Sequence, residues 1–327
     1  MNEAAIETEA LVKAFGEVRA VDGIDMVARE GTVFGLLGPN GAGKTTAIRV
    51  LSTLLKPDSG RAIVGGYDVV RQPNEVRASI GLTGQYAAVD ELLSGAENLY
   101  MLGRLIGMSR AAARARAAEL LEAFELSDAG DRFVKTYSGG MRRRLDLASS
   151  LVGRPRFLYL DEPTTGLDPR SRAELWGLIR RLVAEGTTVL LTTQYLEEAD
   201  RLADELVVID HGKVIAAGTP SELKGKVGAQ VVAVRPTEGR DVPRAVEILT
   251  AFSEDGSTHA DGEFVMGTIA DPSQLGTIAR RFDDEAIQLD ELSLRRASLD
   301  EVFLALTGHV AEEDASFDES IDSGRSR

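Results

Sequence analysis

The sequence predicts an α/β protein with a mostly parallel β-sheet, followed by a small C-terminal α+β domain. The first observation is that short apolar runs at 157–160, 188–192 and 206–209 alternate with helical segments. Buried parallel strands are apolar throughout, and helices connect them. The second observation is a glycine-rich turn between an apolar run at 32–37 and a helical run at 45–55. Strand, glycine loop and helix in this order are typical of a doubly wound sheet.

Composition narrows the class of protein. The chain has 327 residues, which is enough for two domains, and a hydrophobic fraction of 43% supports a full core. A formal net charge of −15 argues against a general nucleic-acid binder, so we expect no nucleic-acid partner. The absence of cysteine excludes disulfides and cysteine-ligated metals. No apolar run approaches the roughly 18 residues that cross a bilayer, so any membrane role is expected to come through a partner.

The first half of the chain divides into a strand-rich part and a helical part. Residues 88–153 carry helical periodicity. Ser109 has the character of a helix N-cap, and a further helix is expected to begin after Ser138-Gly139-Gly140. Before them, strands are expected at 5–30, 61–67 and 79–83, with turns at Gly16, near Asp22-Gly23 and at 57–60.

The second half predicts one more helix in the sheet domain and then a new pattern. A helix at 171–184 connects two of the apolar strands, and His211-Gly212 predicts a hairpin. Residues 225–308 are predicted to form the α+β accessory domain, and the acidic tail 309–327 is expected to be disordered. Within the accessory domain, strands are expected at 231–235, 264–269 and 287–294, and helices at 243–252, 273–282 and 298–307.

The glycine-rich turn predicts a polyphosphate site. It fits the pattern G-x-x-x-x-G-K-[ST] and consists of Gly38, Pro39, Asn40, Gly41, Ala42, Gly43, Lys44, Thr45 and Thr46. Its glycines allow successive N–H groups to surround phosphates, and the following helix adds its positive end. Lys44 supplies a charge for the outer phosphates, and Thr45 supplies a hydroxyl for magnesium. A plain glycine turn is the simpler alternative, but the loop and both flanks agree with the phosphate site.

Two further motifs predict chemistry near that loop. Asp161 and Glu162 follow the strand at 157–160, so they are expected at the sheet edge that carries the phosphate loop. Asp161 would hold magnesium through water, and Glu162 would act as general base towards the attacking water. A solvated acidic turn is the alternative. The segment Ser138-Gly139-Gly140 opens a helix whose N–H groups are suited to phosphate, although an ordinary N-cap has the same sequence.

Together these motifs, in this order, resemble the ATP-binding subunit of an ABC transporter over about residues 5–220. The resemblance implies an ATP-binding domain at 5–224 that contains an antiparallel β subdomain, a helical subdomain at 88–153 and sites for ATP and magnesium. Its matched motifs are Walker A at 38–46, the Q-loop at Gln85, the signature at Ser138–Met141, Walker B at Asp161-Glu162, the D-loop at Gly166-Leu167-Asp168 and an adenine-stacking Phe15. The resemblance also implies that Thr45, Gln85 and Asp161 hold magnesium.

The family resemblance further implies partners and a location. Two copies dock head to tail, so that each ATP lies between Walker A of one copy and the Ser138 loop of the other. Gln85 and the helical region transmit this cycle to an integral membrane permease. The expected location is the cytoplasmic face of a bacterial membrane.

The residue Gln194 departs from the family pattern, which has histidine at this position to contact the γ-phosphate. An amide can donate a hydrogen bond but cannot carry a proton. Gln194 therefore substitutes as a phosphate contact, marks slow hydrolysis, or marks a module with little turnover. With Lys44 and Glu162, it completes the expected catalytic set.

Three segments narrow the resemblance to daunorubicin-resistance-type ATPases, which are mostly actinobacterial drug-export subunits. They are residues 84–90, 193–200 and 298–308. Export of a hydrophobic drug, a polyketide or a lipid is therefore expected. Two alternatives remain: a soluble ABC protein that acts on ribosomes or DNA, and a nucleotide-gated regulatory module that is not coupled to transport. The acidic charge and the single ATPase unit argue against the first.

Overall fold

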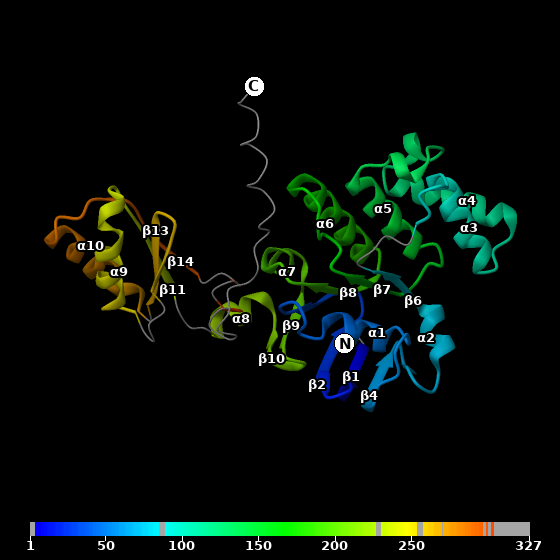
Figure 1. Cartoon of the computed structure of the whole chain (residues 1–327), viewed down its shortest axis with the longest axis horizontal. Helices are drawn as coiled ribbons and strands as arrows, with labels where there is room; N and C mark the ends of the chain where they lie inside the picture. The colour runs from blue at the N-terminus through cyan, green and yellow to red at the C-terminus, as the bar shows by residue number, and fades with distance from the viewer. Residues whose placement is uncertain are drawn as a thin grey trace, which may run out of the picture. The chain divides into compact units, whose positions relative to one another are not determined.

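The computed structural model describes residues 4–84, 89–226, 230–253, 258–269 and 271–296, together with residues 299, 302 and 303. The chain divides into two compact units, and the division falls between Thr219 and Pro220 (Figure 1). The boundary expected after residue 224 would cut through helix α8 (Pro220–Lys226), which belongs to the second unit.

The first unit contains the predicted parallel sheet. Its strands are β3 (Val33–Leu37), β6 (Ile80–Thr83), β7 (Phe157–Asp161), β8 (Thr188–Thr193), β9 (Glu205–Asp210) and β10 (Lys213–Gly218). Their order is β10-β9-β3-β8-β7-β6, and every neighbouring pair is parallel except β9–β10. The β9–β10 pair is the hairpin predicted at His211-Gly212, where both residues have positive φ, 45° and 78°. The prediction of a mostly parallel sheet is confirmed.

This sheet is covered on both faces, which explains its continuous apolar strands. Along β7, Leu158 and Leu160 enter one buried cluster, whereas Phe157 and Tyr159 enter another. The first cluster also contains residues of α5 (Gly139–Ser150) and α6 (Pro169–Ala184), and the second contains residues of α1 (Lys44–Leu51). Figure 1 shows α5 and α6 on one side of the sheet and α1 on the other. Because side chains alternate along a strand, a fully apolar strand requires two cores.

An antiparallel sheet lies on the α1 side. Its strands are β1 (Ala4–Phe15), β2 (Val18–Arg29), β4 (Ser59–Val64) and β5 (Tyr67–Asp68), in the order β2-β1-β4-β5.

Two sequence predictions in this antiparallel sheet are wrong. No turn forms at Asp22-Gly23, because Gly23, with φ of 79°, is the extra residue of a bulge in the continuous strand β2. The single strand expected at 61–67 is a hairpin, because Gly65 and Gly66 both have positive φ.

The helix after the phosphate loop ends earlier than expected. Helix α1 stops at Leu51 rather than near Leu55. Thr53 has a positive φ of 64°, and the N–H groups of both Leu54 and Leu55 donate to the Arg49 carbonyl. Helix α2 (Pro73–Ser79) was not predicted at all, because it is one short run with a single buried residue, Val76, and therefore shows no apolar period.

The helical subdomain contains α3 (Gly95–Leu105), α4 (Arg110–Ala123) and α5, with short 3-10 turns at Ser127–Ala129 and Val134–Thr136. The N-cap predicted at Ser109 is confirmed, and α5, expected after Gly140, begins at Gly139 with Ser138 as its N-cap. Ser109 accepts a hydrogen bond from the Ala112 N–H at 3.1 Å, and Ser138 accepts one from the Met141 N–H at 3.2 Å. Ser94 begins α3 with a reciprocal capping box to Glu97. No helix among the described residues combines the length and the apolar character that a membrane span requires.

The second unit is α+β, as predicted. Its antiparallel sheet has the order β12-β13-β11-β14, from strands β11 (Gln230–Pro236), β12 (His259–Asp261), β13 (Phe264–Ile269) and β14 (Leu289–Arg296). Besides α8, its described helices are α9 (Val242–Thr250) and α10 (Leu275–Asp284), with 3-10 turns at Gly239–Asp241 and Pro272–Gln274. Strand β12 was missed because it has only three residues. Most of the helix predicted at 298–307, and the whole tail 309–327, lie outside the described residues.

Candidate functional site

The phosphate loop runs from the end of β3 to the start of α1, and only glycine fits at two of its positions. Gly43 has φ of 109°, and a Cβ atom there would lie 2.1 Å from the Ala20 carbonyl oxygen. A Cβ atom at Gly38 would lie 2.3 Å from the Ile209 carbonyl oxygen. The loop backbone therefore presses against β2 and β9, which holds its N–H groups at the mouth of α1.

The side chain of Lys44 folds back over this loop. Its Nζ atom donates to the carbonyl oxygens of Gly38 at 2.7 Å and Pro39 at 3.2 Å. It also lies 3.2 Å from Glu162 Oε1, although both side chains are largely buried, with 4% and 9% exposed. A cavity of about 150 Å³ lies beside this pair and is lined by Ala20, residues 40–46 and Glu162. The phosphate loop and Walker B therefore meet at one cavity, as predicted.

Thr45 and Asp161 provide a pair of hard oxygen ligands at the same place. Thr45 Oγ1 lies 3.1 Å from Asp161 Oδ1, and Thr192 Oγ1 donates to that same carboxylate oxygen at 2.6 Å. Magnesium prefers oxygen ligands and commonly takes only one or two from the protein, with phosphates and water completing the shell. Among the described residues no group of three or more acidic, histidine or cysteine side chains forms a metal cluster. The Thr45–Asp161 pair fits magnesium bound together with phosphates.

Glu162 has a constrained backbone. Its φ is 49°, which is rare for a residue with a Cβ atom. Its N–H is held by Thr192, through the hydroxyl at 3.1 Å and the carbonyl at 3.1 Å. The end of β8 therefore fixes where the Glu162 carboxylate leaves β7. Strained conformations of this kind persist where surrounding contacts over-determine them.

Arg143 of α5 is a site residue that the sequence reasoning missed. Its guanidinium is buried and connects α5 to the segments that follow β6 and β7 through hydrogen bonds. Burial lowers the pKa of this guanidinium, while the nearby charge of Asp146 opposes that shift. Its acceptors are the carbonyl oxygens of Pro163 at 2.6 Å, Gly84 at 2.8 Å, Glu162 at 3.1 Å and Asp161 at 3.4 Å, and the Asp146 carboxylate at 3.3 Å.

No local signal identifies this role, because Arg143 lies in a run of three arginines, 142–144, that has the sequence of a solvated basic face.

The signature loop and the D-loop lie side by side within the chain. A Cβ atom at Gly140 would lie 2.7 Å from Ser171 Oγ. Ser171 in turn donates to the Asp168 carboxylate, from its N–H at 3.0 Å and from its hydroxyl at 2.6 Å. These hydrogen bonds lower the pKa of Asp168, which is the N-cap of α6. Among the described residues, the lining of the Walker A cavity includes neither Ser138 nor Asp168.

The remaining predicted site residues have different environments. Phe15 ends β1 with 51% of its surface exposed, and Lys13 Nζ lies 5.7 Å from its ring centre, so it is not a core residue. Gln85 lies outside the described residues, although the Gly84 carbonyl before it is held by Arg143. Gln194 follows β8, and its buried Oε1 atom accepts no hydrogen bond from the described residues.

Comparison with known proteins agrees with this geometry. A family model described as ABC transporter matches residues 21–165. A daunorubicin resistance ATP-binding protein of Streptomyces coeruleorubidus is 56% identical, covering 95% of this chain and 98% of that protein. A daunorubicin/doxorubicin resistance ATP-binding protein of Streptomyces peucetius is 54% identical, covering 94% of each. The Nod factor export ATP-binding protein I of Ralstonia nicotianae is 41% identical, covering 93% and 94%.

Solved structures show the same cassette. A nucleotide-free ATP-binding cassette from an ABC transporter superposes with a TM-score of 0.63 at 28% identity, covering 69% of this chain and 95% of that one. An ATP-binding cassette in its ADP conformation gives 0.61 at 29% identity, covering 67% and 92%. The relatives at more than half identity cover nearly the whole chain, and the structures cover the cassette. The chain therefore belongs to the ABC transporter family, in which it is an ATP-binding ATPase subunit.

Proposed function

We propose that this chain hydrolyses ATP with magnesium between two copies of itself, and that the cycle powers efflux of a hydrophobic drug, polyketide or lipid. The observation that carries the proposal is the meeting of Lys44, Thr45 and Glu162 at one small cavity of about 150 Å³. Charge for the phosphates, a hydroxyl for the metal and a carboxylate for the water are the groups that phosphoryl transfer requires.

The residues divide the chemistry between them. Lys44 and the N–H groups of the loop bind the outer phosphates. Thr45 and Asp161 would hold magnesium, and the bound ion would supply positive charge beside the phosphates. Glu162 accepts a proton from water as the water oxygen bonds to the γ-phosphorus. The bond to the β–γ bridging oxygen breaks, and the products are ADP and phosphate.

The Lys44–Glu162 contact suggests how the general base is made available. An incoming phosphate competes with the Glu162 carboxylate for the Lys44 ammonium, which lies 3.2 Å from it. Once Lys44 turns to the phosphate, the carboxylate loses its charged partner and becomes available to the attacking water. The buried surroundings strengthen both interactions, since charges attract more strongly away from bulk water.

A second copy supplies the other half of the nucleotide site. Ser138 and the N-terminus of its helix are exposed, and the Ser138 oxygen already accepts a hydrogen bond from Met141. A hydroxyl that accepts in this way keeps its own proton for donation to a phosphate oxygen. The exposed ring of Phe15 is suited to stacking on adenine.

We place the permease contact on the helical subdomain, at the cytoplasmic face of the membrane. Four large apolar side chains there are more than half exposed, which is typical of a protein-binding surface: Leu92 at 70%, Leu105 at 74%, Ile106 at 56% and Phe133 at 53%. A cleft of about 760 Å³ opens between α3 and α4, beside Tyr100 and Phe133. The drug-resistance relatives support an efflux permease as the partner.

The decisive experiment uses the Glu162→Gln variant, which should bind ATP without hydrolysing it. With ATP it is expected to sediment as a dimer, and from native membranes it should co-purify with a polytopic membrane protein. Lys44→Ala, which should not bind ATP, is the control for the dimer. A Glu162→Gln protein that stays monomeric with ATP would reject the sandwich. Recovery of only soluble partners would reject the efflux role.

Gln194 favours one second candidate, a nucleotide-gated regulatory module with little turnover. This second hypothesis predicts that Gln194→His raises the ATP hydrolysis rate strongly and that Glu162→Gln changes the rate little. A wild-type rate that collapses in Glu162→Gln would exclude it.

A further inference from the structure

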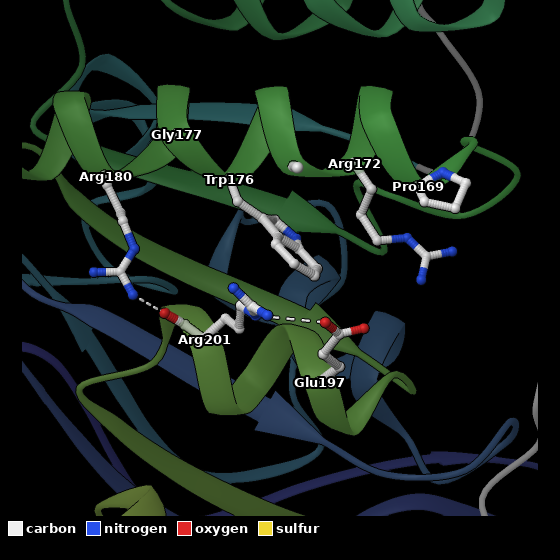
Figure 2. Close-up of a pocket in the computed structure, with 8 residues that line it drawn as sticks. Pro169, Arg172, Trp176, Gly177, Arg180, Glu197 and Arg201 are labelled. Carbon is white, nitrogen blue, oxygen red and sulfur yellow. Dashed lines mark hydrogen bonds and ion pairs between the residues drawn. The ribbon is translucent and has the colours of Figure 1, made fainter.

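Helices α6 and α7 (Leu196–Leu202) are joined by a ladder of three side-chain contacts. Figure 2 shows the pocket between the two helices, with Arg172, Trp176 and Arg180 on α6 and the contact from Arg180 to Arg201 as a dashed line. On α6 the contacting residues are four apart, and on α7 with its N-cap they are three apart. This spacing places each set on one face of its helix. The rungs are Arg172 over the Tyr195 ring at 5.0 Å, Trp176 donating to Glu198 at 3.0 Å, and Arg180 donating to the Arg201 carbonyl.

The middle rung is the buried one. Trp176 Nε1 donates to Glu198 Oε1, and the exposed fractions of the two residues are 8% and 0%. Burial raises the pKa of Glu198, and hydrogen bonds from Thr193, Trp176 and Thr164 partly oppose that shift. Arg201 covers the outer face of the same indole at 5.8 Å and is held by Glu197 at 3.4 Å. The outer rungs are partly open to solvent, so they are expected to contribute less than the middle one.

Each helix in this ladder begins at a loop of the nucleotide site. Asp168 is the N-cap of α6. Tyr195, the N-cap of α7, directly follows Gln194. The first rung, Arg172 over Tyr195, therefore joins the first turn of α6 to the residue beside Gln194. With only seven residues, α7 is too short to be stable alone, so its position depends on such tertiary contacts.

We propose that Trp176 and Glu198 are positioning residues for Gln194. Their contact fixes the position of Gln194 relative to the D-loop residue Asp168. The inference rests on the proposed function, because it requires Gln194 to contact the γ-phosphate. Besides Trp176, Glu198 interacts with Thr193, which directly precedes Gln194, and with Thr164. A displacement of α7 moves Gln194 and leaves Lys44 and Thr45 in place.

The test compares single and double variants in steady-state ATP hydrolysis. Trp176→Phe removes the N–H donor and keeps an aromatic ring, and we expect kcat to fall about 10-fold, which corresponds to one lost positioning hydrogen bond. The KM for ATP should stay within about 2-fold, because the P-loop binds the phosphates independently. Glu198→Gln retains an acceptor for the indole N–H and should retain most of kcat, whereas Glu198→Leu should behave like Trp176→Phe.

Combining these variants with Gln194→Ala distinguishes a positioning effect on Gln194 from a general loss of structure. In a Gln194→Ala background, Trp176→Phe and Glu198→Leu should cause no further loss of kcat. A loss that persists undiminished in that background would overturn the inference. Ile179→Val is the matched control, because it removes a buried methylene from α6 without removing a polar contact; it should lower Tm and leave kcat unchanged.

The ladder also has its own spectroscopic reporter, since Trp176 is the single tryptophan of the chain. Glu198→Leu should shift the emission of folded protein, and Glu198→Gln should shift it less. Hydrolysis that is lost in Glu162→Gln but unaffected by Trp176→Phe would reject this inference and leave the proposed function standing. A wild-type protein that does not hydrolyse ATP would reject the proposed function, and the inference with it.

Discussion

Lys44 of the phosphate loop and Glu162 at the end of β7 form a buried ion pair, with Nζ and Oε1 3.2 Å apart. The pair joins the two motifs that are expected to bind the phosphates and to activate water. Taking two charges out of water is costly, and their mutual attraction and further hydrogen bonds offset that cost. Lys44 obtains those bonds from the Gly38 and Pro39 carbonyls. The stability of the apoprotein and its chemistry therefore depend on the same two side chains.

Removal of one partner of this pair should destabilise the apoprotein. Lys44→Met leaves the Glu162 carboxylate buried without its cation, and we expect a loss of about 3 kcal/mol in urea unfolding without nucleotide. The double variant Lys44→Met/Glu162→Gln should lose less than the sum of the two single variants. The exposed pair of Lys13 and Asp58 provides the control, and Lys13→Met should cost under about 1 kcal/mol. Strict additivity at Lys44 and Glu162 would contradict the pairing.

Arg143 should be required for both folding and turnover. Arg143→Met strands the Asp146 carboxylate and several carbonyls, so we expect a loss of about 3 kcal/mol or more in urea unfolding. Arg143→Lys restores the charge but not the fork of donors, so it should recover only part of the stability and of kcat. Arg142→Lys, at the neighbouring position, is the matched comparison and should change both quantities little. Full activity in Arg143→Met would show that the carbonyls need no guanidinium.

Ser138 should have two separable roles, and Ser109 shows how to separate them. Both are helix N-caps with nearly equal geometry, so Ser138→Ala and Ser109→Ala should each cost about 1 kcal/mol in urea unfolding. Only Ser138→Ala should also weaken ATP-dependent dimerisation of the Glu162→Gln protein, measured by sedimentation velocity. Equal dimerisation in both variants would mean that the Ser138 hydroxyl does not contact the nucleotide.

Gln194 should give ATP binding that does not depend on protonation near neutral pH. The amide does not titrate, so the affinity of wild-type protein for ATP should show no inflection from this residue. Gln194→His introduces a group with an ordinary pKa of about 6.5, and its protonated form attracts phosphate. Affinity of that variant should therefore rise as pH falls through about 6.5, as measured by titration calorimetry. Identical pH profiles would show that position 194 does not reach the phosphates.

The second unit contains an ion pair that predicts a loss of its folding stability at acidic pH. Arg244 donates to both carboxylate oxygens of Glu285, at 2.7 and 2.8 Å, and this lowers the pKa of Glu285 below its ordinary 4.5. A lowered folded-state pKa contributes stability above pH 4.5 that is lost as pH falls through the folded value. Arg244→Gln should raise the Glu285 pKa in a carboxyl NMR titration. Arg280→Gln, at an exposed arginine of α10, should leave it nearly unchanged.

The sequence alone determined the features that depend on local chemistry. In the segment from Gly38 to Thr46, the glycines determine the shape of the loop. Lys44 and Thr45 indicate the class of ligand, which is a phosphate with magnesium. The apolar strands identified the sheet, His211-Gly212 identified the hairpin, and Ser109 identified the start of α4. Each of these depends on residues within a few positions of one another, so a single chain segment carries the whole signal.

Only the tertiary structure decided which distant residues share a site. Gly23 makes a bulge rather than a turn because β2 pairs with β1 on both sides of it, which no local pattern shows. Arg143 lies in a sequence typical of a surface helix. Its role depends on the carbonyl groups of Pro163 and Gly84, which lie far from it in the sequence and accept hydrogen bonds from its guanidinium. Trp176 and Glu198 lie on different helices. Their contact exists because α6 and α7 pack against each other along one face of each helix. Which side chains become buried together depends on this packing and not on their order in the sequence.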